Sequence, residues 1–189
     1  HDSKSKTADV RERVFSETLK KEYPNMTVAG AYRLDEMKKS VSDEVNKGLY
    51  RLDDEEPSGT ELAEEEKIKE EDVTRDNIID YILKKHPNMK GCYATNGETV
   101  VLAVEGIKRR SMSGISVIGY DADEEEVRAV KEGEIAGLIV QNPYGMGYAS
   151  VIAAARAALG MANEANIDTG YVWMTKDNID SEEIERMLY

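Results

Sequence analysis

The sequence has few of the residues that form covalent cross-links or hold metal ions. Its 189 residues include one cysteine, Cys92, and two histidines, His1 and His86. A single thiol excludes an internal disulfide and a cysteine-based zinc site. Two histidines, one of them the terminal residue, exclude a histidine-rich metal centre. We therefore predict no metal site and no cofactor.

The sequence also lacks an excess of positive charge and any long apolar run. It carries 25 lysines and arginines against 38 acidic residues, a formal net charge of -13. Nucleic acids and anionic membrane surfaces are bound through clustered cations, so neither is expected as a partner. No apolar run is long enough for a transmembrane helix, and no signal peptide is recognisable. The first residues read as a loop entering a helix, which favours a chain that begins within a longer protein.

Sequence motifs of common α/β enzymes are missing as well. There is no glycine-rich dinucleotide loop, no phosphate-binding loop and no Gly-x-Ser-x-Gly motif. His86 has no nucleophile partner that the sequence suggests, and the candidate site contains one clear carboxylate rather than a spaced pair. We predict no catalytic residue and a protein that is not an enzyme.

The second part of the sequence shows regular alternation of helical and strand patterns. The expected strands are continuous apolar runs, as in sheets that helices cover. They lie at residues 91–95, 115–120, 135–140 and 171–174, between helices at 77–85, 97–110, 124–132, 145–161 and 181–188. Upstream, the pattern predicts a helix that ends before Pro24, a buried strand at 26–32 and a helix at 35–47. This order predicts the α/β class with a doubly wound parallel sheet.

An acidic segment interrupts this pattern. Residues 43–72 contain 13 acidic and 4 basic residues, a local charge of -9. We expect a solvated surface excursion, partly helical over 61–71 and too polar to join the core. The ligand spacing of an EF-hand is absent, so a calcium loop of that type is not predicted.

Polar side chains follow three of the expected strands. Asn96, Asp121 and Gln141 each stand where a strand ends. Because ligands bind beyond the carboxyl ends of parallel strands, we expect the three to converge there. A carboxylate accepts hydrogen bonds and amides both donate and accept, which suits hydroxyl groups. Each also has a local alternative: Asn96 and Asp121 as helix N-caps, and Gln141 as the end of a strand before a turn.

A set of motifs in order resembles the ribose/galactose class of periplasmic sugar-binding proteins, which supply ABC importers. They are DVRERVF at 9–15, YATNGE at 93–98, VIGYD at 117–121, GEIAG at 133–137, VQNPY at 140–144 and TKDNID at 175–180. The resemblance implies one lobe of the two-lobed type I periplasmic-binding fold. Three departures are a glycine at 97 where aspartate is common, a valine at 14 where glycine is common, and the long acidic segment.

The resemblance implies roles for five residues. Arg11 would donate to sugar hydroxyls or the ring oxygen, and Asn96 and Asp121 would bind adjacent hydroxyls. Gln141 would lie at the hinge edge of the pocket, and Tyr32 would line it. Residues 1–141 would form the ligand-binding lobe, with an acidic insertion at about 36–72.

Residues 142–189 would supply a crossover helix, a strand and the C-terminal tail. The helix at 145–161 would belong to a lobe that this chain does not contain. We expect it to fold back, to cross to another chain in a dimer, or to pair with a separate N-terminal lobe, because a large exposed apolar face is unfavourable in water.

The function implied by the resemblance is the substrate-binding component of an ABC importer. It would bind a sugar or polyol by lobe closure and deliver it to a membrane permease. The protein would then be periplasmic or extracellular, with a lipoprotein anchor as one arrangement. The alternative is the effector-binding domain of a lac-repressor-type transcription regulator, which would be cytoplasmic.

Overall fold

The computed structural model, which describes residues 1–53 and 55–188, is built around one mixed sheet. Its strands lie in the order β1 (Gly91–Tyr93), β2 (Ser116–Tyr120), β3 (Gly137–Gln141) and β4 (Tyr171–Met174). The first three strands are parallel, and β4 runs antiparallel to β3. The α/β class with parallel strands is thus confirmed, with one strand reversed.

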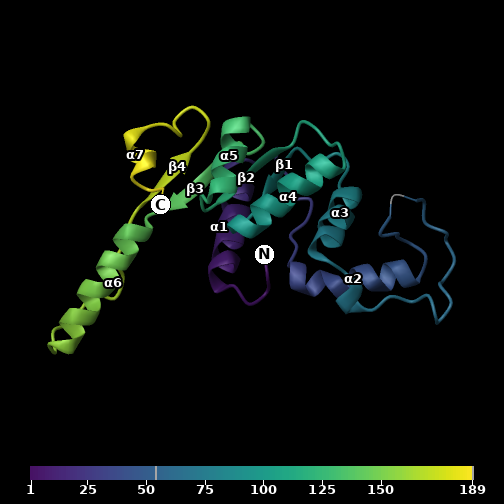
Figure 1. Ribbon diagram of the computed structural model, residues 1–189, viewed down its shortest axis with the longest axis horizontal. Helices are drawn as coiled ribbons and strands as arrows, with labels where there is room; N and C mark the ends of the chain where they lie inside the picture. The colour runs from purple at the N-terminus through teal and green to yellow at the C-terminus, as the bar shows by residue number, and fades with distance from the viewer. Residues whose placement is uncertain (54, 189) are drawn as a thin grey trace.

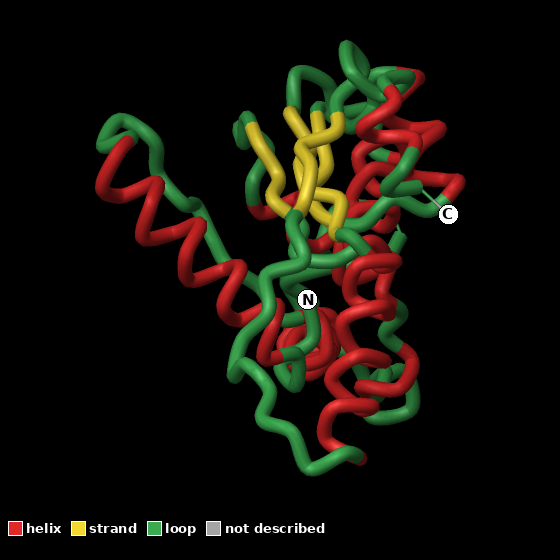
Figure 2. Tube along the Cα trace, turned by 90° about the vertical axis from the view of Figure 1, so that its left-hand side faces the viewer, coloured by secondary structure: helices red, strands yellow, loops and turns green. Residues whose placement is uncertain are grey.

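Three helices alternate with the strands at the expected places. They are α3 (Arg75–Lys85), α4 (Gly97–Arg109) and α5 (Glu124–Glu132). Because β1, β2 and β3 advance in one direction, right-handed connections place α4 and α5 on the same face of the sheet. Helix α7 (Glu182–Glu185) lies on that face too (Figures 1 and 2). The main core lies between these helices and the sheet.

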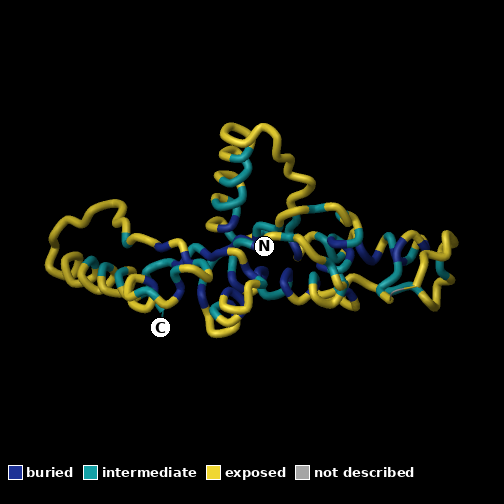
Figure 3. Tube along the Cα trace, turned by 90° about the horizontal axis from the view of Figure 1, so that it is seen from above, coloured by how far each residue is buried: buried dark blue, intermediate teal, exposed yellow. Residues whose placement is uncertain are grey.

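The opposite face of the sheet is only partly covered. Helix α1 (Lys6–Glu22) begins against β1 and β2, where Phe15 stacks on Tyr93 with ring centroids 4.0 Å apart. Beyond Phe15 the last turns of α1 project away from the body of the molecule (Figure 3). On this face Tyr171 and Trp173 of β4 remain 69% and 44% exposed.

The expected strand at residues 26–32 is a correction. The segment has no regular structure, and Met26 is 61% exposed. A strand needs a hydrogen-bonded neighbour, and β1 pairs only with β2 in the recorded sheet. A further strand on the free edge of β1 would have wound the sheet in both directions; without it, α4 and α5, which connect the parallel strands, lie on one face.

The acidic segment joins a second core, which corrects the expectation that it is too polar to do so. Helix α2 (Leu34–Asn46) packs with α3. Tyr50 is buried beside Tyr81 in an edge-to-face contact, with ring centroids 4.9 Å apart. Leu62 and Ile68 pack against the same cluster. Within 61–71 the only helical turn is the start of the 3₁₀ helix Glu70–Asp72. A few apolar residues anchor the segment while its carboxylates face water. The average composition of the segment does not reveal this arrangement.

Helix α6 (Pro143–Ala158) projects from one end of the molecule (Figures 1 and 3). None of its residues is buried, and Tyr148 and Val151 are 62% and 68% exposed. Because β4 is antiparallel to β3 and Gln141 pairs with Tyr171, the chain leaves the sheet and re-enters it at the same end. Helix α6 therefore does not have to cross the sheet. No helix in the described residues is long and apolar enough to cross a membrane.

Candidate functional site

Asp121 joins the ends of three strands. It follows β2, and its Oδ1 accepts a hydrogen bond of 2.9 Å from Gln141 Nε2 at the end of β3. Its Oδ2 accepts a hydrogen bond of 3.1 Å from the backbone amide of Gly97, just beyond β1. Asp121 also has a positive φ of 74°, a left-handed conformation that few residues other than glycine adopt. The two hydrogen bonds hold the carboxylate in place.

The structure shows whether Asn96 and Asp121 are helix N-caps, which was the local alternative for each. Asn96 is the N-cap of α4, since its Oδ1 accepts from Thr99 N at 2.9 Å and Thr99 Oγ1 at 2.7 Å. Asp121 is not an N-cap, because α5 is capped by Asp123 two residues later. The Asn96 amide nitrogen has no recorded hydrogen bond within the described residues, so the cap leaves its donors available.

Arg11 brings a cation to the same edge. Its Nη1 donates a hydrogen bond of 2.7 Å to the carbonyl of Thr95, at the end of β1. Its guanidinium carbon lies 3.7 Å from the ring centroid of Tyr120, a cation–π contact. The planar guanidinium is thereby fixed, with further N–H donors beyond the one used.

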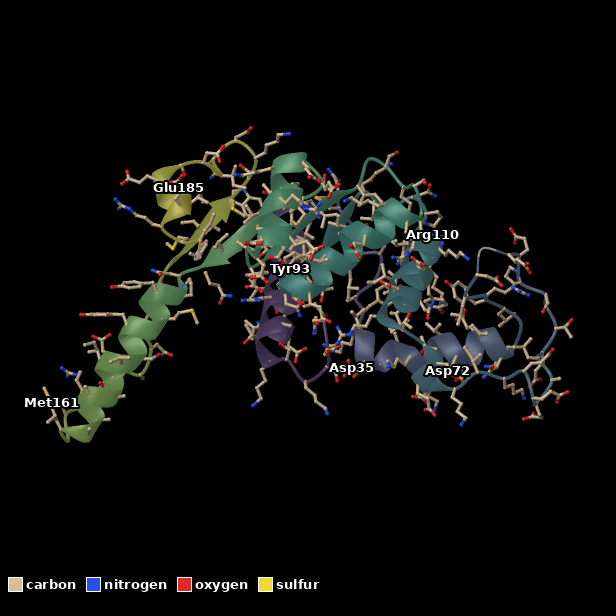
Figure 4. The ribbon with its side chains drawn as sticks, in the orientation of Figure 1. Asp35, Asp72, Tyr93, Arg110, Met161 and Glu185 are labelled. Carbon is tan, nitrogen blue, oxygen red and sulfur yellow. The ribbon has the colours of Figure 1, made fainter. Side chains whose placement is uncertain are left out.

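Two tyrosines also belong to this site, although the sequence analysis gave them no role; they stand in the motifs at 93–98 and 117–121. The hydroxyls of Tyr93 and Tyr120 are 3.3 Å apart, and Tyr93 lies where the sheet meets α1 (Figure 4). Burial raises the pKa of the Tyr93 hydroxyl above its usual value. The signal was in the strand alternation, which points Tyr93 and Tyr120 to the face opposite Ala94 and Val117.

Tyr32 makes its side-chain contacts elsewhere, unlike the other four candidates. Its hydroxyl is 2.6 Å from His86 Nε2, at the C-terminal end of α3. That end of α3 precedes β1, whereas the other four candidates gather beyond the carboxyl ends of the strands. The structure thus brings together Arg11, Asn96, Asp121 and Gln141 but not Tyr32. No cluster of three or more metal-binding side chains occurs in the described part of the chain.

A family model described as a periplasmic binding protein domain matches residues 31–162. The chain belongs to this family, which confirms the resemblance seen in the motifs. Among curated proteins, it is 27% identical over 84 residues to the ribose import binding protein of Salmonella typhimurium, covering 44% of this chain and 28% of that protein. It is 28% identical over 143 residues to the xylitol-binding protein of Mycolicibacterium smegmatis, covering 74% of this chain and 40% of that protein.

A solved structure supports the fold over almost the whole chain. It is an ABC transporter solute-binding protein from Agrobacterium vitis bound to α-D-tagatopyranose, with a TM-score of 0.69 and 22% identity. The match covers 97% of this chain and 50% of that one. This chain therefore spans half or less of each of these three proteins.

Proposed function

We propose that this chain provides one jaw of a sugar- or polyol-binding site in the solute-binding component of an ABC importer. The observation that carries the proposal is the meeting of Asn96, Asp121 and Gln141 beyond three adjacent parallel strands, with Arg11 beside them. These groups offer both acceptors and donors to hydroxyls. Ribose and xylitol, for which two relatives are named, are ligands of this chemical class.

Each of the four residues has a proposed role in holding the ligand. Asp121 accepts from hydroxyls, with its position set by Gly97 and Gln141. The free donors of Asn96 and Arg11 reach the remaining ligand oxygens. Only one side of a ligand is met this way, so affinity depends on closure of a second lobe over it.

Helix α6 is the element that we assign to that second lobe. Its exposed apolar residues include Tyr144, Met146, Tyr148, Val151 and Ile152. A contiguous apolar surface of this kind marks an interface. We propose that it packs against an N-terminal lobe, in a longer protein or as a separate fragment, or exchanges with a second copy in a dimer. Residues 1–141 and 142–189 remain our proposed division of the chain.

Location and partners follow from the same proposal. A solute-binding component works outside the cytoplasm, in the periplasm or at the cell surface, and delivers its ligand to a membrane permease. The regulator alternative shares the fold, but the curated relatives named above include an import binding protein and a xylitol-binding protein. Binding proteins of this family are not enzymes, and we assign no catalytic residue.

Isothermal titration calorimetry with D-ribose, D-arabinose and xylitol tests the function, on this chain and on any longer protein that carries it. Asp121→Asn should weaken binding at least tenfold, since it replaces a charged acceptor on which two strand ends converge. Asp177→Asn is the matched control, because Asp177 is an exposed carboxylate away from the site. Binding that both variants leave unchanged would reject Asp121 as a ligand residue.

A further inference from the structure

Glu126 is a buried carboxyl group that the proposed site does not yet use. It is the third residue of α5, and 1% of it is exposed. Its Oε2 accepts a hydrogen bond of 2.8 Å from the backbone amide of Asp123, which closes a capping box at the start of the helix. Its Oε1 is buried and has no hydrogen-bond partner among the described residues. Buried polar atoms are rarely left unpaired, so this oxygen requires an explanation.

The carboxyl of Glu126 lies directly behind the candidate ligand residues. A Cβ atom built on Gly97 would lie 2.3 Å from Glu126 Oε1 and 3.4 Å from the Cβ of Asp121. The carboxyl therefore fills the space that a side chain at position 97 would need. The amide of Gly97 is also the donor to Asp121 Oδ2. Glu126 thus packs against the backbone that orients Asp121.

The electrostatic surroundings of Glu126 disfavour its charged form. Burial is the main cause, and the nearby charges that act on it among the described residues are all negative. They are Asp121 beyond β2, and Asp123 and Glu125 at the start of α5; on the α4 side it meets uncharged Gly97. The hydrogen bond from the Asp123 amide acts in the opposite direction, but burial and these negative charges outweigh it and raise the pKa of Glu126 to about 7.

We propose that Glu126 is a positioning residue of the ligand site, which acts through Gly97 and Asp121 and supports ligand binding in its neutral form. This inference rests on the proposed function. A ligand held by Asp121 displaces water from this corner and makes a carboxylate at Glu126 still less favourable. Ligand binding and protonation of Glu126 are then coupled, and each favours the other. Affinity should fall as pH rises through neutrality.

The test is calorimetric binding of D-ribose, D-arabinose and xylitol at pH 5.5, 7 and 8.5. We expect binding by the unaltered protein to weaken several-fold across this range, up to about tenfold for each pKa unit added by the ligand. Glu126→Gln keeps the shape and an oxygen for the Asp123 amide but cannot ionise, so its binding should not vary with pH. Glu124→Gln is the matched control, an exposed neighbour on the same helix, and should retain the dependence.

A second measurement needs no variant. Titrations near pH 7 in buffers of different ionisation enthalpy should reveal proton uptake on ligand binding by the unaltered protein. Binding without proton uptake, or a pH dependence that persists in Glu126→Gln, would overturn the role of Glu126 and leave the sugar-binding function standing. Failure of the unaltered protein to bind any of the three ligands at any pH would overturn the proposed function, and the role of Glu126 with it.

Discussion

Helices α4 and α6 begin alike and end in different surroundings. Each follows a parallel strand, and each is capped by an asparagine, Asn96 or Asn142, whose side chain accepts a backbone amide hydrogen bond. Yet α4 buries Val100 and Val104 against the sheet, whereas α6 buries none of its residues. The difference lies in the strand that comes after each helix. Helix α4 connects two parallel strands and must cross the sheet, whereas α6 leads to an antiparallel strand and need not.

The sequence of a helix therefore predicts where the helix begins and ends more fully than it predicts what the helix packs against. The apolar residues of α6 are as suited to burial as those of α4, and only the path of the chain leaves them bare. This is why we assign α6 to an interface and α4 to the core.

A charge placed in each helix should give the strongest contrast between them. Val100 is fully buried, so Val100→Asp places an unpaired carboxylate in the core and should cost about 4 kcal/mol or more, enough to unfold a marginal domain. Val151 is 68% exposed, so Val151→Asp should leave the unfolding free energy of this chain nearly unchanged. Urea unfolding monitored by circular dichroism measures both.

Light scattering extends that contrast to assembly. If α6 packs against a second copy or a separate lobe, Val151→Asp should lower the observed mass although it does not unfold the chain. A loss of stability from Val151→Asp equal to that from Val100→Asp would show that α6 is packed within this chain.

Helix α5 is packed like α4, and it buries a titratable group, Glu126. The pKa of Glu126 is raised to about 7 from 4.5, so the folded state holds a proton that the unfolded state releases. Stability is therefore greatest below about pH 4.5 with respect to this group, falls as pH rises, and stops falling above about pH 7. The linked loss should approach about 3 kcal/mol. Unfolding free energies measured from pH 5 to 8 should show it, and Glu126→Gln should remove this component; a slope that survives in Glu126→Gln would assign it to another group.

The sequence predicted the repeating units of this fold better than their surroundings. The helices and strands from α3 to β4 lie close to their expected places, because apolar runs, caps and short connections are local signals. The strand expected at 26–32 failed because an apolar run cannot show whether a neighbouring strand edge is available. The acidic segment was misjudged because a few residues, such as Tyr50 and Ile68, anchor it against a core formed by α2 and α3.

The candidate site was predictable to the extent that it depends on strand ends. Asn96, Asp121 and Gln141 follow from topology once the strands are placed. Tyr32 came only from the family resemblance, and its hydroxyl meets His86 instead. The sequence did not indicate the role that we propose for Glu126. That role depends on Gly97, a residue of another helix, whose lack of a side chain leaves space for the Glu126 carboxyl.

The two asparagine caps should give the weakest contrast between α4 and α6. Loss of an N-cap costs about 1 kcal/mol when the helix end is part of the cooperative fold. Asn96→Ala should therefore lower the unfolding free energy by about that amount, because the first turns of α4 are buried against the sheet. Asn142→Ala should lower it by less, because an exposed helix can fray without unfolding the core. Amide hydrogen exchange distinguishes the two cases: protection should fall across the core in the first variant and only within α6 in the second. Equal effects in both assays would mean that α6 shares the stability of the sheet, and the comparison between the two helices would then fail.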